Sequence, residues 1–497
     1  MVNKIIHYSF FILHISIVFI LLSCAESPTD VQKVNEQPKI YPDYIGVTIP
    51  VGIAPMNFDV DADNVECLDV IVKGSKGGEL HSNGKVMELD IDDWHSLVER
   101  NRGGKLSFTL CVKQNGAWKQ YDDFEMMVSD YALDEWGLTY RRVAPGYEVF
   151  GEMGLYQRDL SNFDEYEIIA NTRIPGMCVN CHTSNRTNPK EFLFHVRGEH
   201  PVTALQKSGK RQMLSTKTDE TLGLCVYPYW HPEGRYIAFS TNTTRQGFHV
   251  VKDERIEVFD FESDLQILDT ETNELILSPL VKGDSIWETF PAFSADGKTL
   301  YFCSATPRQY PLEFKETRYN LCSIGFDAQN GRWGEKVDTV INAVVDSMSV
   351  TLPRPSYDGK WLMYTRSSYG TFPIWHKEAD LWLLNLKTDE SRPLTEVNSD
   401  DTESFHNWNV NSHWFVFSSR RGDGLYTRLY LSSIDDEGKA TKPFLLPQKN
   451  PKHYYERMMQ SYNTPDFTSE KVDFDSRSAA NEILQQKSTS LSSRLGQ

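Results

Sequence analysis

A diverged repeat in the second half of the chain constrains its fold more than any other feature. The clearest copies have an aromatic or apolar strand, an Asp-Gly or Glu-Gly turn, and a second strand that alternates apolar and polar residues. Two further strand-like runs follow, such as 265–269 and 380–385, so one unit contains four strands. Four-stranded units at this period predict the blades of a β-propeller. The copies occupy 228–240, 291–302, 354–364 and, in eroded form, 407–417.

An open solenoid is the alternative arrangement for such repeats. A closed ring is favoured because each unit has four strands, and only closure protects the strand edges. The fourth copy has Ser412 at the position of the turn glycine, which predicts a longer or reshaped turn there. Upstream, residues 190–195 match the second strand of a blade, and residues 154–160 resemble the third strand of another. The sequence therefore predicts about six blades.

The repeat resembles the blades of TolB-like (WD40-like) propellers, whose consensus reads approximately P-x-W-S-P-D-G-K before an apolar strand. Here the segment 228–235 reads P-Y-W-H-P-E-G-R, and the resemblance covers about residues 190–447. It is clear in three units. The resemblance implies a propeller that binds envelope proteins or glycans.

Cys178, Cys181 and His182 form a C-x-x-C-H sequence, the covalent attachment signature of a c-type haem. Two thiols bind the porphyrin vinyl groups, and His182 would be the proximal iron ligand. Aligned with the repeat, this segment falls on the innermost strand of a blade, with 185–189 as an enlarged turn. Half of a zinc site and a disulfide are the alternatives. The remaining cysteines do not complete a zinc pattern, since they are scattered singly: Cys67, Cys111, Cys225, Cys303 and Cys322.

The sixth iron ligand decides whether the iron can bind small molecules. His231 is our candidate, because in the repeat it lies on the equivalent turn of the next blade and hence at the same face as the haem. The alternatives are an ordinary turn histidine, a vacant position, or one of four other residues. These four are Met177, His195, His200 and Met213.

The N-terminus has the pattern of a bacterial lipoprotein signal peptide. Lys4 precedes an apolar run to Leu22, and Leu-Leu-Ser-Cys ends at Cys24. A transmembrane anchor is the alternative, but Ser23 and the polar residues after Cys24 favour cleavage and lipidation of that cysteine. The mature chain is then exported and tethered to a membrane by acyl chains. Haem attachment to C-x-x-C-H also takes place outside the bacterial cytoplasm, so the two signals agree.

These observations predict an all-β chain. We expect a signal peptide at 1–23, a flexible linker at 24–42, and a β-sandwich of immunoglobulin or fibronectin type at 43–130. The propeller follows at 131–467, and 468–497 form a disordered or weakly helical tail.

The net charge of −18 argues against nucleic acid as a partner, because phosphate binding requires a basic surface. The sequence contains no nucleophile elbow, phosphate loop or dinucleotide fingerprint, so an enzyme is not the favoured interpretation. The leading hypothesis is a lipid-anchored propeller with one haem c, in the periplasm or at the outer membrane. It would transfer electrons or sense redox state, with a redox protein such as a multihaem cytochrome as partner. The alternatives are a non-catalytic binding scaffold and a haem enzyme that acts on a small molecule.

Overall fold

The computed structural model describes residues 26–144, 151–248 and 255–496. The expected signal peptide and Cys24 lie outside these ranges. The chain divides into two compact units. The first contains residues 54–128 and 447–455 together with the N-terminal residues up to 46, and the second contains 47–53, 129–446 and 456–497. Among the described residues, no helix combines the length and apolar character that a membrane span requires.

The first unit is built mainly from strands. Its main sheet has the order β1-β8-β7-β5-β6, and β9 also pairs with β7. Phe58, Phe108 and Phe124 pack at its centre, and the last two rings stack with centroids 4.9 Å apart. The sequence analysis did not predict the helix α2, which Asp90 caps by accepting hydrogen bonds from two backbone amides. The elements are β1 (Gln32–Lys33), β2 (Ile40–Tyr41), β4 (Asp59–Val60), β5 (Val65–Gly74), β6 (Glu79–Gly84), α2 (Ile91–Arg100), β7 (Lys105–Gln114), β8 (Ala117–Gln120) and β9 (Phe124–Val128).

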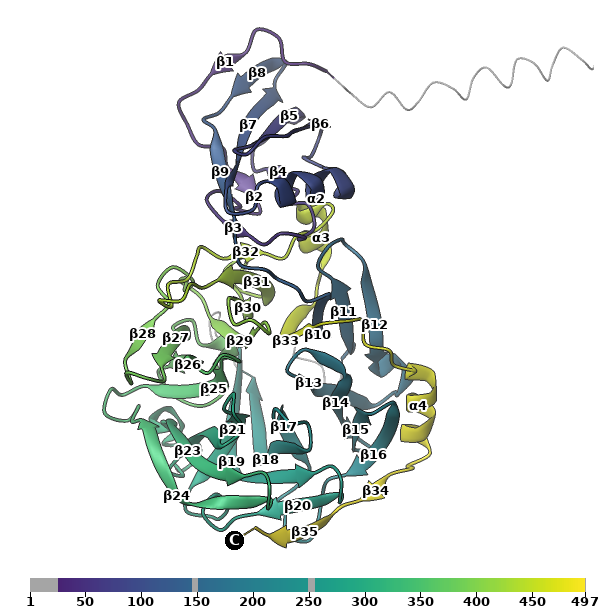
Figure 1. Ribbon diagram of the computed structural model, residues 1–497, viewed down its shortest axis with the longest axis vertical. Coiled ribbons are helices and arrows are strands. Elements are labelled where there is room, and N and C mark those ends of the chain that lie inside the picture. Colours follow the sequence, from purple (N-terminus) through teal and green to yellow (C-terminus); the bar gives the residue numbers. More distant parts are fainter. Residues whose placement is uncertain (1–25, 145–150, 249–254, 497) are drawn as a thin grey trace, which may run out of the picture. The chain divides into compact units, whose positions relative to one another are not determined.

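In the second unit, six sheets form the blades of a propeller (Figure 1). From the inner strand outward, blade 1 comprises β33 (Ser461–Thr468), β10 (Gly137–Val143), β11 (Met153–Asp159) and β12 (Glu165–Ala170). Blade 2 comprises β13 (Met177–Asn185), β14 (Asn188–Gly198), β15 (Val202–Lys207) and β16 (Lys210–Ser215). Blade 3 comprises β17 (Cys225–Trp230), β18 (Tyr236–Phe248), β19 (Ile256–Asp269) and β20 (Glu274–Leu277).

The other three blades follow in chain order. Blade 4 comprises β21 (Trp287–Phe293), β22 (Thr299–Ala305), β23 (Asn320–Asp327) and β24 (Arg332–Ile341). Blade 5 comprises β25 (Ser349–Pro355), β26 (Trp361–Ser367), β27 (Asp380–Asn385) and β28 (Ser391–Pro393). Blade 6 comprises β29 (Glu403–Trp408), β30 (Trp414–Ser419), β31 (Arg428–Ser433) and β32 (Phe444–Leu445). The unit also contains β3 (Thr48–Ile49) and the last two residues of helix α3 (Pro451–Arg457). Its three short 3-10 helices are η1 (Asn171–Arg173), η2 (Phe314–Glu316) and η3 (Pro373–Trp375).

The ring closes through the C-terminal part of the chain. The inner strands β13, β17, β21, β25, β29 and β33 contact one another in a complete circle. Strand β33 supplies the inner position of blade 1, whose other strands come from residues 137–170. The expected number of blades, the all-β class and the closed ring are therefore confirmed, and residues 154–160 fall on the third strand of blade 1 as predicted.

Every inner strand contains a β-bulge at the same position. The bulge residue has left-handed backbone angles, with φ between +47° and +55°, and strand pairing shifts register beside it. Several of the bulge side chains belong to one hydrophobic cluster, so this level of the central channel is filled. The six bulge residues are Cys181, Tyr227, Phe290, Leu352, Phe405 and Thr464.

Two expectations about turns are wrong. Ser412 does not reshape its turn, because its backbone N–H donates to Asn409 at 3.0 Å, as Gly297 donates to Ser294 at 2.9 Å. Serine adopts the required left-handed conformation, with φ of +64°. The turn after β13 is also short and not enlarged, since Asn185 pairs directly with Asn188.

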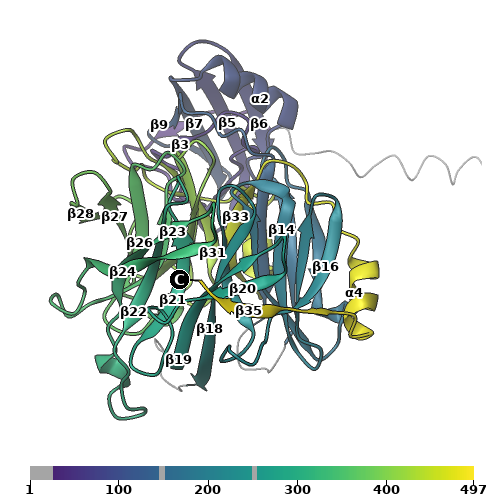
Figure 2. The same cartoon turned by 60° about the horizontal axis from the view of Figure 1, so that its bottom comes forward.

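The C-terminal tail is ordered, contrary to the expectation of a disordered or weakly helical extension. Helix α4 (Ser476–Leu484) packs Ala479, Ala480 and Ile483 into the hydrophobic cluster of blade 2. Strands β34 (Thr489–Ser490) and β35 (Ser492–Leu495) then pair in parallel with the outer strands β16 and β20 (Figure 2). The polar composition of the tail did not reveal this, because its few apolar residues find their partners only on the blades.

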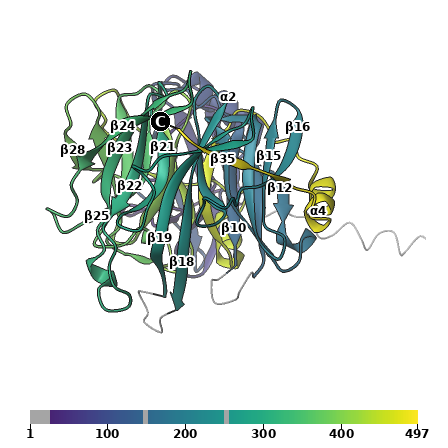
Figure 3. The same ribbon diagram turned by 90° about the horizontal axis from the view of Figure 1, so that it is seen from below.

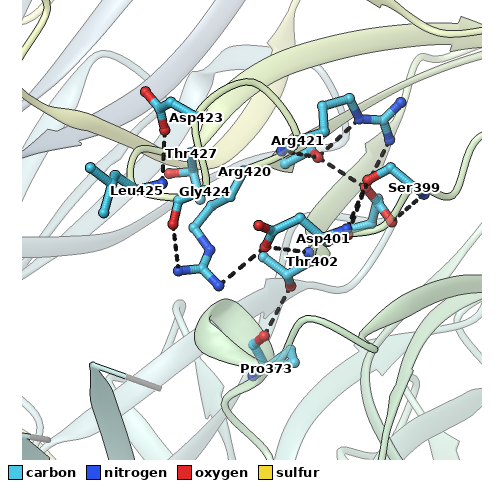
Figure 4. A network of polar contacts seen from close by, with 12 residues as sticks. Pro373, Ser399, Asp401, Thr402, Arg420, Arg421, Asp423, Gly424, Leu425 and Thr427 are labelled. Carbon is cyan, nitrogen blue, oxygen red and sulfur yellow. Dashed lines mark hydrogen bonds and ion pairs between the residues drawn. The ribbon is translucent and has the colours of Figure 1, made fainter. Parts of the chain in front are cut away.

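A buried ionic network holds the loop between β30 and β31 (Figure 4). The Arg420 side chain is 1% exposed, lies 3.2 Å from the Asp401 carboxylate, and stacks over Trp375 at 3.9 Å. The next residue, Arg421, pairs with the buried Glu403 at 2.8 Å. Arg420 therefore connects this loop to Asp401, which lies just before β29, and Arg421 connects it to Glu403, the first residue of β29.

Candidate functional site

The C-x-x-C-H segment lies on β13, the inner strand of blade 2. Cys181 is the bulge residue of this strand, and His182 takes the position after the bulge. Blade 6 has His406 at that position, and the other four blades have proline: Pro228, Pro291, Pro353 and Pro465. The motif is thus superimposed on a backbone feature that all six blades share.

Both thiols lie beside guanidinium groups. Cys178 and Cys181 are 7% and 5% exposed. The Arg141 Nη2 atom lies 3.7 Å from the Cys178 sulfur, and Arg197, which pairs with Cys178 across the sheet, lies next to both thiols and to Tyr227.

His182 is buried as well. Its ring is 6% exposed, packs 6.1 Å from Phe192, and approaches the Thr139 backbone of the neighbouring blade. Burial lowers the pKa of His182 to about 4, so the ring is neutral at physiological pH. Neither ring nitrogen has a hydrogen-bond partner among the described residues. His406, at the equivalent position, also has two unpartnered nitrogens, which indicates a shared packing role between blades.

The geometry of this segment does not fit covalent haem attachment. Cys178, Cys181 and His182 are all buried on a strand that pairs with β14, which leaves no room for a porphyrin beside them. On an extended strand, Cys178 and Cys181 have Cα atoms roughly 10 Å apart, also too far for a disulfide. A haem would require β13 to separate from β14. The zinc alternative gains no support either, because the described residues contain no group of three or more His, Cys, Asp or Glu side chains placed to hold a metal. Haem attachment stays a prediction.

His231 does not meet the motif. Its ring is 1% exposed and packs against Phe293 and Tyr236. The Nε2 atom lies 3.1 Å from the Gly297 carbonyl oxygen, and the Nδ1 atom lies 3.3 Å from the Glu233 amide nitrogen. Because both nitrogens are engaged within blades 3 and 4, the structure does not favour His231 as an iron ligand.

The other candidate ligands are equally dispersed. Met177 and Met213 belong to the hydrophobic cluster of blade 2. His195 is buried, bonds Thr203 through Nδ1 at 3.2 Å, and has a pKa lowered to about 3 by burial. His200 lies between β14 and β15, outside both strands.

The turn end of the central channel has a different and more organised set of side chains. A hollow is lined there by residues of blades 2 to 6, so it must lie near the ring axis. We call its polar part the channel-mouth site, defined as Arg186, Arg354, Tyr229, Tyr357 and Asn407.

Two guanidinium groups dominate the channel-mouth site. Arg186 lies 5.5 Å from the Tyr357 ring centroid, and Arg354 lies 5.3 Å from that of Tyr229. Each arginine makes one hydrogen bond, to a backbone carbonyl, and the described structure gives neither of them a carboxylate within ion-pair distance. Since a guanidinium has five N–H donors, most of these donors remain available to a ligand.

Asp466 of β33 lies beneath this site. Its carboxyl group accepts hydrogen bonds from the Asn407 side chain at 2.8 Å and from the Ser184 backbone at 3.1 Å. Burial raises the pKa of Asp466 to about 7, although Ser184, Arg354 and Thr183 oppose the shift. The carboxyl group therefore changes charge near neutral pH.

The sequence analysis missed the channel-mouth residues. Arg186 and Arg354 are ordinary turn or strand residues in the sequence, and Asp466 is more than 100 residues from both. One signal was present, because Arg354 and Asp466 both lie one residue after the proline that follows a bulge. Arg354 and Asp466 could have been aligned only if residues 465–467 had been recognised as a further copy of the repeat.

No family model and no curated protein matches the sequence. Among solved structures, the chain is similar to TolB from Acinetobacter baumannii, with 12% identity and a TM-score of 0.42, over 77% of this chain and 86% of that one.

An oligogalacturonate lyase from Vibrio parahaemolyticus has 13% identity and a TM-score of 0.36, with 58% of this chain and 70% of the lyase covered. Prolyl oligopeptidase B from Galerina marginata has 11% identity and a TM-score of 0.37, over 80% of this chain but only 54% of the peptidase. Identities this low concern the fold alone, and the strand topology already establishes it.

Proposed function

We propose that the protein is an exported binding protein that holds a carboxylate-bearing ligand in the channel-mouth site. The observation that carries this proposal is the pair Arg186 and Arg354, whose N–H donors face a hollow at the channel axis without a protein carboxylate in ion-pair range. Guanidinium groups form paired hydrogen bonds with planar carboxylates, and the tyrosine rings beneath them hold their orientation. The ligand would be an acidic group of an envelope protein or glycan.

The export signal supports this setting. The Leu-Leu-Ser-Cys sequence that ends at Cys24 indicates a lipid-anchored protein in the periplasm or at the outer membrane of a bacterium. A propeller tethered in this way meets envelope polymers directly. The proposal needs no bond-making step, which agrees with the lack of a catalytic motif in the sequence.

Isothermal titration calorimetry tests the proposal. The purified protein is titrated with a tri-aspartate peptide and with a glucuronate oligomer, and each is compared with its neutral counterpart, tri-asparagine or a glucose oligomer. Inorganic phosphate serves as a further probe, because guanidinium groups also bind phosphate. Binding of an acidic probe but not of its neutral counterpart is the expected result. Equal heats for acidic and neutral probes would refute carboxylate recognition, and preference for phosphate would reassign the ligand.

The affinity of the channel-mouth site is expected to fall as the pH rises through about 7. Below this pH the Asp466 carboxyl is neutral, whereas above it the carboxylate competes with the ligand for Arg354. The other facing groups do not titrate in this window, because burial raises the pKa of Tyr229 to about 12 and that of Tyr357 well above 10. Titrations between pH 5.5 and 8.5 measure the effect.

Asp466→Asn provides the control for this pH dependence. The variant should bind with nearly constant affinity over the same range, because its amide does not ionise. Its stability should also change less with pH. The folded-state pKa of about 7 lies above the ordinary value of 3.8, so the wild-type protein loses stability as the pH rises between these values. A pH profile that Asp466→Asn leaves intact would contradict this assignment.

Electron transfer through a covalent haem is the second candidate function. The observation in its favour is His182, whose two buried ring nitrogens are available to a metal. Cys178 and Cys181 would hold the porphyrin, which would supply the redox chemistry, and a redox protein would be the partner. The same haem would be the cofactor if the protein were an enzyme that acts on a small molecule.

Intact mass spectrometry decides between the two candidates. Protein from a host that matures c-type cytochromes should gain one haem mass if the second candidate is right, and Cys178→Ala with Cys181→Ala should remove the gain. The strand geometry leads us to expect the unmodified mass. A haem adduct would show that β13 rearranges during maturation.

A further inference from the structure

A second hollow lies at the other end of the propeller. Its walls come from the β18–β19 hairpin and the connections that follow β22 and β26. These are connections between second and third strands, whereas the channel-mouth site lies on turns between first and second strands. The hairpin is long, with pairing from Tyr236 to Phe248, and extends past the neighbouring strands (Figure 3).

Two carboxylates of β19 face this hollow. Glu257 is 5% exposed and lies 2.8 Å from the Tyr369 hydroxyl and 3.2 Å from the His376 Nε2 atom. Asp260 accepts hydrogen bonds from Tyr319 at 2.8 Å and from Thr371 at 2.9 Å. Within the described chain, neither carboxylate forms an ion pair with a lysine or arginine. Burial raises the pKa of Asp260, and the hydrogen bonds from Tyr319 and Thr371 oppose that shift, so a cation in the hollow would favour the charged carboxylate.

Aromatic rings form the rest of the wall. Phe259 contacts Tyr310 and Phe314, with ring centroids 4.6 Å and 5.0 Å away, and Phe314 contacts Tyr369 at 5.7 Å. Ring faces attract cations, and several rings around a hollow recognise alkylated ammonium groups. The chain itself demonstrates this property, because the Lys315 ammonium lies 5.8 Å from the Phe314 centroid and 5.6 Å from that of Tyr369.

We propose that this hollow binds a small organic cation with a quaternary ammonium group. The two carboxylates supply the opposite charge, and the rings contact the methyl groups, which hydrogen bonds alone cannot recognise. A hydrated metal ion fits less well, because the described residues hold no cluster of three metal ligands and aromatic rings occupy part of the wall. The site is separate from the channel-mouth site and stands without it.

Two exposed cations of the chain lie at the rim. Arg308 lines the hollow, and Lys315 covers two of its rings. Because the Lys315 ammonium occupies the same ring faces as the ligand would, it competes with the ligand. Lys315→Met should therefore increase the affinity for the cation by several-fold.

Calorimetric titration with choline tests the proposal, and its uncharged isostere 3,3-dimethyl-1-butanol provides the matched probe. Choline should bind and the alcohol should not. Asp260→Asn should weaken choline binding by about tenfold or more, equal to about 1.4 kcal/mol. Glu262→Gln, on the same strand but exposed, should leave it unchanged.

A ring substitution keeps the test valid if the carboxylate variant unfolds. Phe314→Leu removes one ring of the wall without changing charge, and it too should weaken choline binding, with thermal unfolding as the check on folding. Equal binding of choline and its isostere would overturn the proposal. So would choline binding that neither Asp260→Asn nor Phe314→Leu reduces in folded protein.

Discussion

Arg354→Gln is expected to weaken binding of a carboxylate probe on the order of 100-fold. The side chain has one internal hydrogen bond, to the carbonyl of Pro353, so nearly all of its donors face the ligand. Removing one partner of a hydrogen-bonded charge pair costs about 2–5 kcal/mol. Glutamine is shorter and neutral but keeps an amide N–H donor, so the loss reports the charge and the paired geometry of the guanidinium group. Titration calorimetry at pH 6, where Asp466 is neutral, measures the effect.

Two comparisons make this result specific. Arg332→Gln changes an exposed arginine of an outer strand and should leave binding and stability unchanged. Arg354→Lys keeps the charge but loses the planar fork, so its affinity should fall between those of the wild type and Arg354→Gln. If Arg354→Gln binds the probe as tightly as Arg332→Gln does, the ligand does not bind in the channel-mouth site.

Arg420→Ala is expected to lower the free energy of unfolding of the propeller by about 3–5 kcal/mol. The substitution leaves the Asp401 carboxylate, which is 8% exposed, without its cationic partner, and it removes the group stacked on Trp375. Urea denaturation followed by tryptophan fluorescence measures the change, since Trp375 reports this region directly.

A double variant separates charge from packing at this site. Arg420→Met with Asp401→Asn removes both charges and retains most of the volume, so it should be more stable than Arg420→Ala. If Arg420→Ala lost less than about 1 kcal/mol, the ion pair would contribute no more than a surface salt bridge does. The network in Figure 4 would then have little influence on the fold.

The repeat was readable in the sequence because its determinants are local. The Asp-Gly turns at 296–297 and 358–359, with a strand on each side, specify a hairpin from a few neighbouring residues. The period of these hairpins then implied a ring. Ser412 was misjudged because glycine is the usual residue at this φ, whereas the surrounding strands hold serine in the same conformation.

The C-x-x-C-H segment was found for a similar reason, but its environment was not. Three residues within a stretch of five identify the motif, yet the motif gives no information about the backbone on which it lies. The bulge at Cys181 exists because all six inner strands bend in the same way around one axis. The packing of the six inner strands around this axis buries Cys178, Cys181 and His182, and the sequence offers no sign of this burial.

The sequence by itself determined the class of the fold, the ring of blades and the position of the motif on an inner strand, because turn chemistry and strand periodicity act between near neighbours. Only the tertiary structure decided which side chains share a site. Arg186 comes from blade 2, Arg354 from blade 5 and Asp466 from blade 1. Strand β33, which closes the ring, brings Asp466 close to the two arginines. The tail likewise became helix and strand only by packing on blades 2 and 3. Such contacts depend on ring closure, which brings together residues that no local pattern connects.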